Sequence, residues 1–292
     1  MINVGSKKAH NSINEKEFLL FSSYIAEKSG IVIPPEKSYL IETRLSKLMA
    51  DSGADNFKDF YDCIISSPDP FMQQKIINAI TINETSWFRD SAPLKVLGEE
   101  LLPGLVKALA AGKKTRVKIW CAATSTGQEV YSTVMCVDDY LKKNKVHGVS
   151  LSDFEFVATD ISSKVLEIAK KGRYNNISMM RGLDDYYKAK YFVESDSAWD
   201  IDPLIRKAVR FEKFNLQDSY QKFGLFDIIF MRYVLIYFSD STKKKTIAKM
   251  HGALKDDGVL FIGNYALYNM FEDGYDAHYY ENLTYYSKKT GV

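Results

Sequence analysis

The stretch Lys118–Ser132, KIWCAATSTGQEVYS, decides how the rest of this chain is interpreted. Its apolar beginning predicts the end of a buried strand, and apolar residues at helical spacing predict a helix over 129–140. The small residues between them would let a ligand approach the backbone at the N-terminus of that helix. The same stretch also fits an ordinary tight strand–helix turn, because it contains only Gly127 where dinucleotide-binding turns carry three glycines.

The composition is that of an ordinary globular protein, with 46% hydrophobic and 26% charged residues in a chain of 292, a length that suits two domains. A net charge of +2 argues against non-specific electrostatic binding of nucleic acid, although a local basic face is still compatible with it. The three cysteines predict reduced core thiols, and the four scattered histidines suggest no metal site. No membrane-length apolar run or signal core is present, so we expect a cytoplasmic protein.

The first eighty residues or so have a helical pattern. Apolar spacing predicts four helices, over 15–29, 37–51, 57–66 and 71–82. We therefore expect a helical N-terminal domain with its junction over 1–90, and an α/β domain over 91–292. The second helix carries Lys37, Arg44 and Lys47 on a basic face, which is either merely solvated or faces an acidic partner.

The junction segment TINETSWFRD, residues 81–90, mixes polar and large aromatic side chains. This mixture suits the lip of a ligand site, and it equally suits a capped turn packed by two aromatic residues.

The α/β pattern continues beyond the central turn. A strand over 154–160 ends at Asp160, where nucleotide-binding sheets place a carboxylate for ribose hydroxyls; the alternative role is a helix-start residue. Residues of about 172–208 are expected to form an insertion, helical at first and then a short hairpin. Further strands are predicted over 209–215, 226–231, 258–263 and 278–289, the last one antiparallel. The alternation predicts a doubly wound α/β sheet with a small β-insertion, preceded by the all-α domain.

Polar residues follow several of these strands, at 124–129, at Asp160, at Asn215 and over 232–237. Because the carboxyl ends of parallel strands share one edge, these residues predict a cofactor pocket. The sequence contains no nucleophile elbow, no GxxxxGK[ST] phosphate loop and no metal motif. This combination points to S-adenosylmethionine, with NAD as the weaker alternative because GxGxxG is absent.

The chain resembles the CheR family of chemotaxis receptor methyltransferases over nearly its whole length. NETSWFRD resembles the family's NET-x-FFR, WCAATSTGQEVYS resembles W-x-A-x-x-STGEEPYS, and FDIIFMRYVLIYF resembles FD-x-IFCRNVLIYF; ATDIS, a following G-x-Y and FNL keep the family order. The resemblance implies S-adenosylmethionine-dependent methyl esterification of glutamate side chains on the cytoplasmic helices of chemoreceptors. The near-zero net charge and the helical N-terminal domain argue against a nucleic-acid partner, and we expect a monomer without membrane insertion.

The resemblance also implies a set of cofactor contacts: Asn83, Thr85, Arg89, Glu129, Asp160, Asn215, Leu216, Tyr233 and Val234. Arg89 and Tyr237 would border the transferred methyl group. Opposite charge further predicts that Arg44 and Lys47 receive the acidic methylation region of the receptor.

The sequence departs from the family pattern at several of these positions. Tyr233 replaces an asparagine, Gln128 and Val130 replace a glutamate and a proline, and GNYA over 263–266 replaces GHSE. Two other functions therefore stay open: a cofactor-binding signalling or adaptor module with decayed catalysis, and a methyltransferase acting on another substrate.

The insertion bears on how a receptor is held, because family members that tether to a receptor's C-terminal pentapeptide use it. No glycine occurs between Gly182 and Gly224, so we expect a tight extra turn to be harder to build. This predicts an enzyme that does not depend on the tether.

Overall fold

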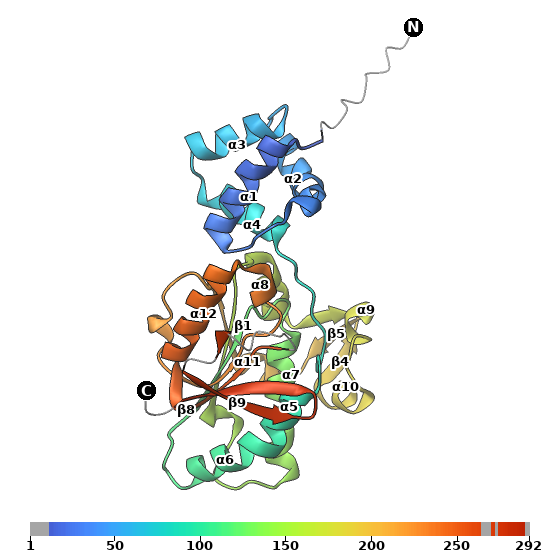
Figure 1. Cartoon of the computed structure of the whole chain (residues 1–292). Coiled ribbons are helices and arrows are strands. Elements are labelled where there is room, and N and C mark those ends of the chain that lie inside the picture. Colours follow the sequence, from blue (N-terminus) through green and yellow to red (C-terminus); the bar gives the residue numbers. More distant parts are fainter. Residues whose placement is uncertain (1–11, 264–269, 272–273, 290–292) are drawn as a thin grey trace. The chain divides into compact units, whose positions relative to one another are not determined.

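The computed structural model describes residues 12–263, 270–271 and 274–289 (Figure 1). They divide between Ile82 and Asn83 into two compact units, each described here by itself. Residues 83–90, which the sequence groups with the helical domain, fall in the second unit. The predicted departure at Asn264–Ala266 lies outside the described residues. None of the described helices combines the length and the apolar character needed to cross a bilayer.

The first unit is helical, as predicted, with α1 (Glu15–Ser29), α2 (Ser38–Asp51), α3 (Phe57–Ser66) and α4 (Pro70–Ile80), and a 3-10 turn, Pro35–Lys37, before α2. Side chains cap three of these helices, since Asn14, Asn56 and Asp69 each accept a backbone N–H of the first turn. The apolar faces of the four helices share one core. Cys63 is exposed at the end of α3, so the expectation that every cysteine is a core thiol was wrong for this one.

The second unit is built on a seven-stranded sheet in the order β6-β2-β1-β7-β8-β10-β9. Its strands are β1 (Val117–Ala122), β2 (Phe154–Asp160), β6 (Val209–Lys213), β7 (Phe226–Phe230), β8 (Leu254–Phe261), β9 (Tyr275–Tyr280) and β10 (Leu283–Lys288). The first five strands in the sheet order are parallel, whereas β10 runs antiparallel to both of its neighbours.

One terminal strand was predicted and the structure has two. Glu281 adopts a positive φ of 49° between β9 and β10 and turns the chain back on itself. The turn consists of Glu281 and Asn282, and although asparagine is a typical turn residue, the segment 278–289 was interpreted as one strand.

Helices cover both faces of the sheet, which confirms the doubly wound architecture. A helical run of α5 (Ala92–Val96), a π-helical turn (Leu97–Leu101) and α6 (Leu102–Ala110) precedes β1, and α7 (Gln128–Lys143) follows it. α8 (Ser163–Lys171) follows β2, and α12 (Asp240–Ala253) connects β7 to β8. Successive side chains of β1 alternate between faces: Ile119 and Cys121 pack into the core of α7, whereas Trp120 and Ala122 pack into the core of α12.

The insertion lies between α8 and β6. It contains β3 (Arg173–Asn175), α9 (Asn176–Met179), α10 (Asp185–Tyr191), β4 (Phe192–Ser195), β5 (Ala198–Ile201) and α11 (Pro203–Lys207), and its sheet has the order β3-β5-β4. The helices before the hairpin and the hairpin itself were predicted, but β3 and α11 were not. The β4–β5 turn consists of Asp196 and Ser197, with φ of 48° and 60°. This two-residue turn of the predicted hairpin forms without glycine, because short polar residues tolerate this conformation.

Candidate functional site

The predicted site residues of the second unit gather at the carboxyl ends of four adjacent parallel strands. In the order β6-β2-β1-β7, Asn215 follows β6, Asp160 ends β2, residues 123–127 follow β1 and Tyr233 follows β7. The sheet thus brings segments that are distant in sequence to one edge, where α/β proteins bind their ligands.

The turn after β1 is strained. Ala123, Ser125 and Gly127 have positive φ values of 57°, 53° and 94°. Two of them carry a Cβ, and such conformations persist mainly where the surrounding structure enforces them, often at functional sites. The Thr124 Oγ1 atom is buried and has no hydrogen-bond partner within the described part of the chain. The turn therefore presents an unpaired hydroxyl next to the helix start.

Asp160 fastens this turn to β2. Its carboxylate accepts hydrogen bonds from the backbone N–H groups of Ser125 and Ser162, both at 2.9 Å. Burial raises the pKa of the Asp160 carboxyl, although these donors act against the rise. The hydroxyl of Ser125 in turn donates to the Asn83 carbonyl at 2.9 Å, and Thr85 lies half-buried just beyond it in the chain. Asp160 is therefore partly structural, whatever else it binds.

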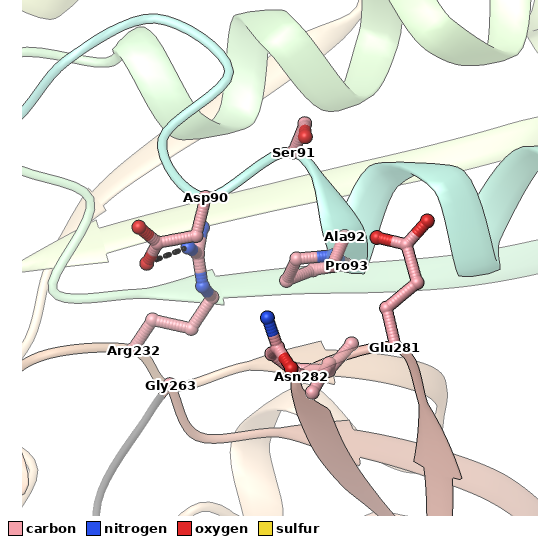
Figure 2. A pocket seen from close by; sticks show the side chains of 9 residues that line it. Asp90, Ser91, Ala92, Pro93, Arg232, Gly263, Glu281 and Asn282 are labelled. Atoms are coloured by element: carbon pink, nitrogen blue, oxygen red, sulfur yellow. Dashed lines mark hydrogen bonds and ion pairs between the residues drawn. The ribbon is translucent and has the colours of Figure 1, made fainter.

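Arg232 lies in the predicted pocket segment 232–237 but was given no role of its own, yet it connects two of the predicted site residues, Arg89 and Glu129. Only 6% of it is exposed, and its Nη1 donates to Glu129 Oε2 at 2.9 Å. Its Nη2 donates to the Arg89 carbonyl at 2.6 Å and to Asp90 Oδ2 at 3.0 Å; Figure 2 shows the contact with Asp90. A basic residue directly after the apolar strand 226–231 was the available signal, because buried cations need partners.

Glu129, in the first turn of α7, depends electrostatically on this arginine. Burial raises the pKa of its carboxyl above the ordinary value, and the positive charges of Arg232 and Arg89 oppose that rise. The three charged groups therefore lie close enough to influence one another.

Arg89 lies on the aromatic ring of Tyr233. Its guanidinium carbon is 3.7 Å from the ring centroid, and its Nη1 donates to the Glu84 carbonyl at 3.2 Å. Tyr233 has a positive φ of 58°. The predicted cofactor contact at this position is thus a stacking surface for the predicted catalytic arginine.

The remaining predicted residues surround the same edge. The Asn215 side chain accepts from the N–H of Gln217 at 3.0 Å in a turn after β6, and Leu216 is buried. Val234 and Tyr237 bound the 3-10 helix Leu235–Tyr237 and pack against the core on the α12 side of the sheet.

A pocket of about 170 Å³ lies beside Arg232 (Figure 2). It is lined by Arg232, Gly263, residues 90–93 and the β9–β10 turn at 281–283. This volume is below the range of about 300–1,000 Å³ that is usual for ligand pockets, so it matches a side chain better than a nucleotide-like cofactor. Across the described residues, no group of three or more His, Cys, Asp or Glu side chains could hold a metal ion.

The two predicted receptor-binding residues lie on α2 of the first unit. Arg44 donates through Nη1 to the carbonyls of Ile80 at 2.6 Å and Thr81 at 3.3 Å, at the C-terminal end of α4. It therefore satisfies helix-end carbonyls within its own unit. Lys47 and Lys37 are exposed.

Comparison with known proteins gives consistent matches. The family model described as "CheR methyltransferase, SAM binding domain" matches residues 83–273, and "CheR methyltransferase, all-alpha domain" matches residues 16–81. Chemotaxis protein methyltransferase 1 of Pseudomonas aeruginosa is 38% identical, with 89% of this chain and 93% of that protein covered. Chemotaxis protein methyltransferase Cher2 of Pseudomonas putida is 35% identical, with 90% and 94% covered. The chemotaxis protein methyltransferase of Borreliella burgdorferi is 31% identical, with 90% and 93% covered.

Proposed function

The chain belongs to the CheR methyltransferase family, and on this premise we propose that it methylates glutamate carboxylates on the cytoplasmic helices of chemoreceptors. The matched S-adenosylmethionine-binding domain identifies the cofactor, and S-adenosylhomocysteine is then the product. The observation that carries the glutamate proposal is the position of Arg89 at the edge where the strands end. Its guanidinium stacks on Tyr233, its positive charge acts on Glu129, and its backbone carbonyl accepts a hydrogen bond from Arg232.

The residues at this edge fit the cofactor. The unpaired hydroxyl of Thr124 offers a donor to a ligand lying against the strained turn. The carboxylate of Asp160 accepts two described N–H bonds and has further lone pairs for ribose hydroxyls. We propose the other cofactor contacts as the resemblance implies them: Asn83, Thr85, Arg89, Glu129, Asn215, Leu216 and Val234. At Tyr233 the implied contact is not carried over, because the family's asparagine amide is absent and the ring stacks on Arg89.

The chemistry requires little from the protein beyond orientation. When bound, S-adenosylmethionine supplies a methyl group that its sulfonium centre already activates. A glutamate carboxylate has an ordinary pKa of about 4.3 and is ionised at neutral pH, so the chain need not supply a general base. We assign to Arg89 the binding of that carboxylate through its planar N–H donors, and Tyr237 borders the reacting atoms. These residues orient the oxygen and exclude water.

For the receptor we propose attraction between its acidic methylation region and the basic side of α2. Lys47 is exposed and available, whereas one guanidinium nitrogen of Arg44 binds the end of α4. Long-range attraction depends on charge and does not need an unused hydrogen-bond donor, so both Arg44 and Lys47 attract the acidic region of the receptor. This attraction weakens as the salt concentration rises. We propose that the protein acts as a cytoplasmic monomer that does not require a pentapeptide tether.

The test is methyl transfer from radiolabelled S-adenosylmethionine to membranes that contain chemoreceptors. Glutamate methyl esters release methanol in mild alkali, whereas N-methyl groups do not, so alkali-labile label in the receptor band supports the proposal. Alkali-stable label would indicate another substrate. Tight binding of S-adenosylhomocysteine without any transfer would favour the signalling or adaptor module. Arg89→Lys, which keeps the positive charge but lacks the planar donors, is the matched control.

A further inference from the structure

The contact between Arg89 and Tyr233 is unusually close. Cation–π contacts extend to about 6 Å from the ring centroid, and here the guanidinium carbon lies at 3.7 Å. At this separation the planar guanidinium rests against the ring, and the arginine cannot turn without leaving it.

The backbone at Tyr233 shows that this ring is held in place by its surroundings. Its φ of 58° lies in the left-handed region, which bulky side chains rarely adopt and in which asparagine is favoured. The sequence resemblance places an asparagine at this position, so tyrosine is the less favourable residue for this backbone. The ring also lies against Gly263, where a Cβ would come within 3.4 Å of ring atom Cζ. Contacts of the ring must therefore offset the strain of the backbone.

Stacking restrains Arg89 in a way that suits its proposed task. Its carbonyl is held by Arg232 at 2.6 Å, and its Nη1 by the Glu84 carbonyl at 3.2 Å. The ring adds a third restraint that uses only the flat face of the guanidinium. A carboxylate binds to the N–H edges in the plane of the group, so stacking fixes the orientation without consuming those donors. An acidic partner in place of the ring would compete with the substrate.

We propose that Tyr233 is a positioning residue that fixes the orientation of Arg89 for the substrate carboxylate, an inference that rests on the proposed function. In this role Tyr233 acts through Arg89 rather than by filling the adenosine pocket. Its substitution should therefore lower kcat while cofactor affinity stays near that of the wild type.

The test compares Tyr233→Asn, which suits the backbone and removes the ring, with Tyr233→Phe, which keeps the ring. We expect Tyr233→Asn to lower kcat for receptor methylation about ten-fold, in the range of a partly desolvated cation–π contact. Affinity for S-adenosylhomocysteine, measured by calorimetry, and the melting temperature should change little. Tyr233→Phe should recover most of the lost kcat. A second comparison uses Tyr233→Leu and Tyr233→Phe. Both residues are unfavourable in the left-handed backbone, so this pair isolates the effect of the aromatic ring.

A double-mutant cycle with Arg89→Gln decides whether Tyr233 acts through the arginine. In the Arg89→Gln background, Tyr233→Asn should have almost no further effect on kcat. An equal loss in both backgrounds, a Phe variant as poor as the Asn variant, or an unchanged kcat in Tyr233→Asn would each overturn the proposal.

A readout without turnover separates this proposal from the proposed function. The side-chain protons of Arg89 should show an upfield ring-current shift by NMR in the wild type and in Tyr233→Phe, but not in Tyr233→Asn. If the shift is present and the wild type does not methylate receptors, the proposed function alone fails. If the shift is absent from the wild type, the stacking itself is disproved.

Discussion

Replacing Arg232 with leucine should destabilise the second unit strongly, because the change leaves a buried carboxylate without its partner. The side chain of Glu129 is only 16% exposed and that of Arg232 only 2%. Breaking a buried ion pair from one side typically costs about 3–5 kcal/mol, and the residual exposure of Glu129 puts our expectation at about 3 kcal/mol. Asp90 adds little, because its side chain is 47% exposed. For a unit of this size, the loss lowers the melting temperature by about 6–12 °C.

The destabilisation should depend on pH with a defined sign. Burial already holds the pKa of Glu129 above its ordinary value, and removal of Arg232 raises it further. A carboxyl whose pKa is higher in the folded than in the unfolded state binds more protons when the protein is folded. The free energy of unfolding therefore falls as the pH rises from the unfolded-state pKa through the folded-state pKa. The cost of Arg232→Leu should therefore be smaller at pH 5 than at pH 7.5. Adding Glu129→Gln should recover part of the loss, because no buried charge then remains unpaired.

Urea denaturation of the wild type, both single variants and the double variant, at the two pH values, measures these free energies of unfolding. Arg210→Leu is the matched control, since that arginine pairs with Glu155 and Glu212 but its side chain is 49% exposed; it should cost at most about 1 kcal/mol. A cost for Arg232→Leu no larger than this control, or one that neither pH nor Glu129→Gln changes, would refute the reasoning.

Three further predictions concern ligands. Asp160→Ala should weaken S-adenosylhomocysteine binding by about 1–3 kcal/mol if its carboxylate accepts from ribose; calorimetry checks this, and unchanged affinity would leave Asp160 with only its structural bonds. Arg89→Lys should lose most methyl transfer in the radiolabel assay while circular dichroism shows an intact fold, because an ammonium group cannot replace the planar donors; near wild-type turnover would remove Arg89 from the catalytic assignment. Reversing charge at Arg44 and Lys47 together should raise the apparent KM for receptor at low salt without changing cofactor binding, and Lys47→Glu alone should do so without disturbing α4. Lys16→Glu, an exposed reversal on α1, is the control, and an equal effect there would contradict specific docking.

The parts of this fold that the sequence predicted are those that a local pattern encodes. The strand, turn and helix around 118–132 were recognised because an apolar run, small residues and helical spacing follow one another within a few residues. The segment β3 has only three residues and was missed. The two-residue turn Glu281–Asn282 was also missed, because aromatic and apolar residues continue on both sides of it as in a single strand.

The site was predictable in its members but not in their interactions. Arg232 and Glu129 are separated by 103 residues, and Arg44 and Ile80 by 36, so no local spacing reveals that they bind each other. The left-handed backbone of Tyr233 was also hidden, because a tyrosine gives no sign of it. The sequence showed that a basic residue, Arg232, directly follows an apolar strand, but it did not show which residues bind it.

The strand order of the second unit has a consequence for how the protein is made. On the ribosome, β2 can pair with β1 soon after both emerge, but β7, the other neighbour of β1, begins only at Phe226. Roughly a hundred residues separate them, and at about 5–20 residues per second the wait lasts about 5–20 s. During that time the edge of β1 that later pairs with β7 is unpaired. Because the end of β1 is apolar, other nascent chains can associate with this edge. The second edge of β8 is covered by β10, so a chain that is released before β10 is made has a sheet with an open, aggregation-prone edge.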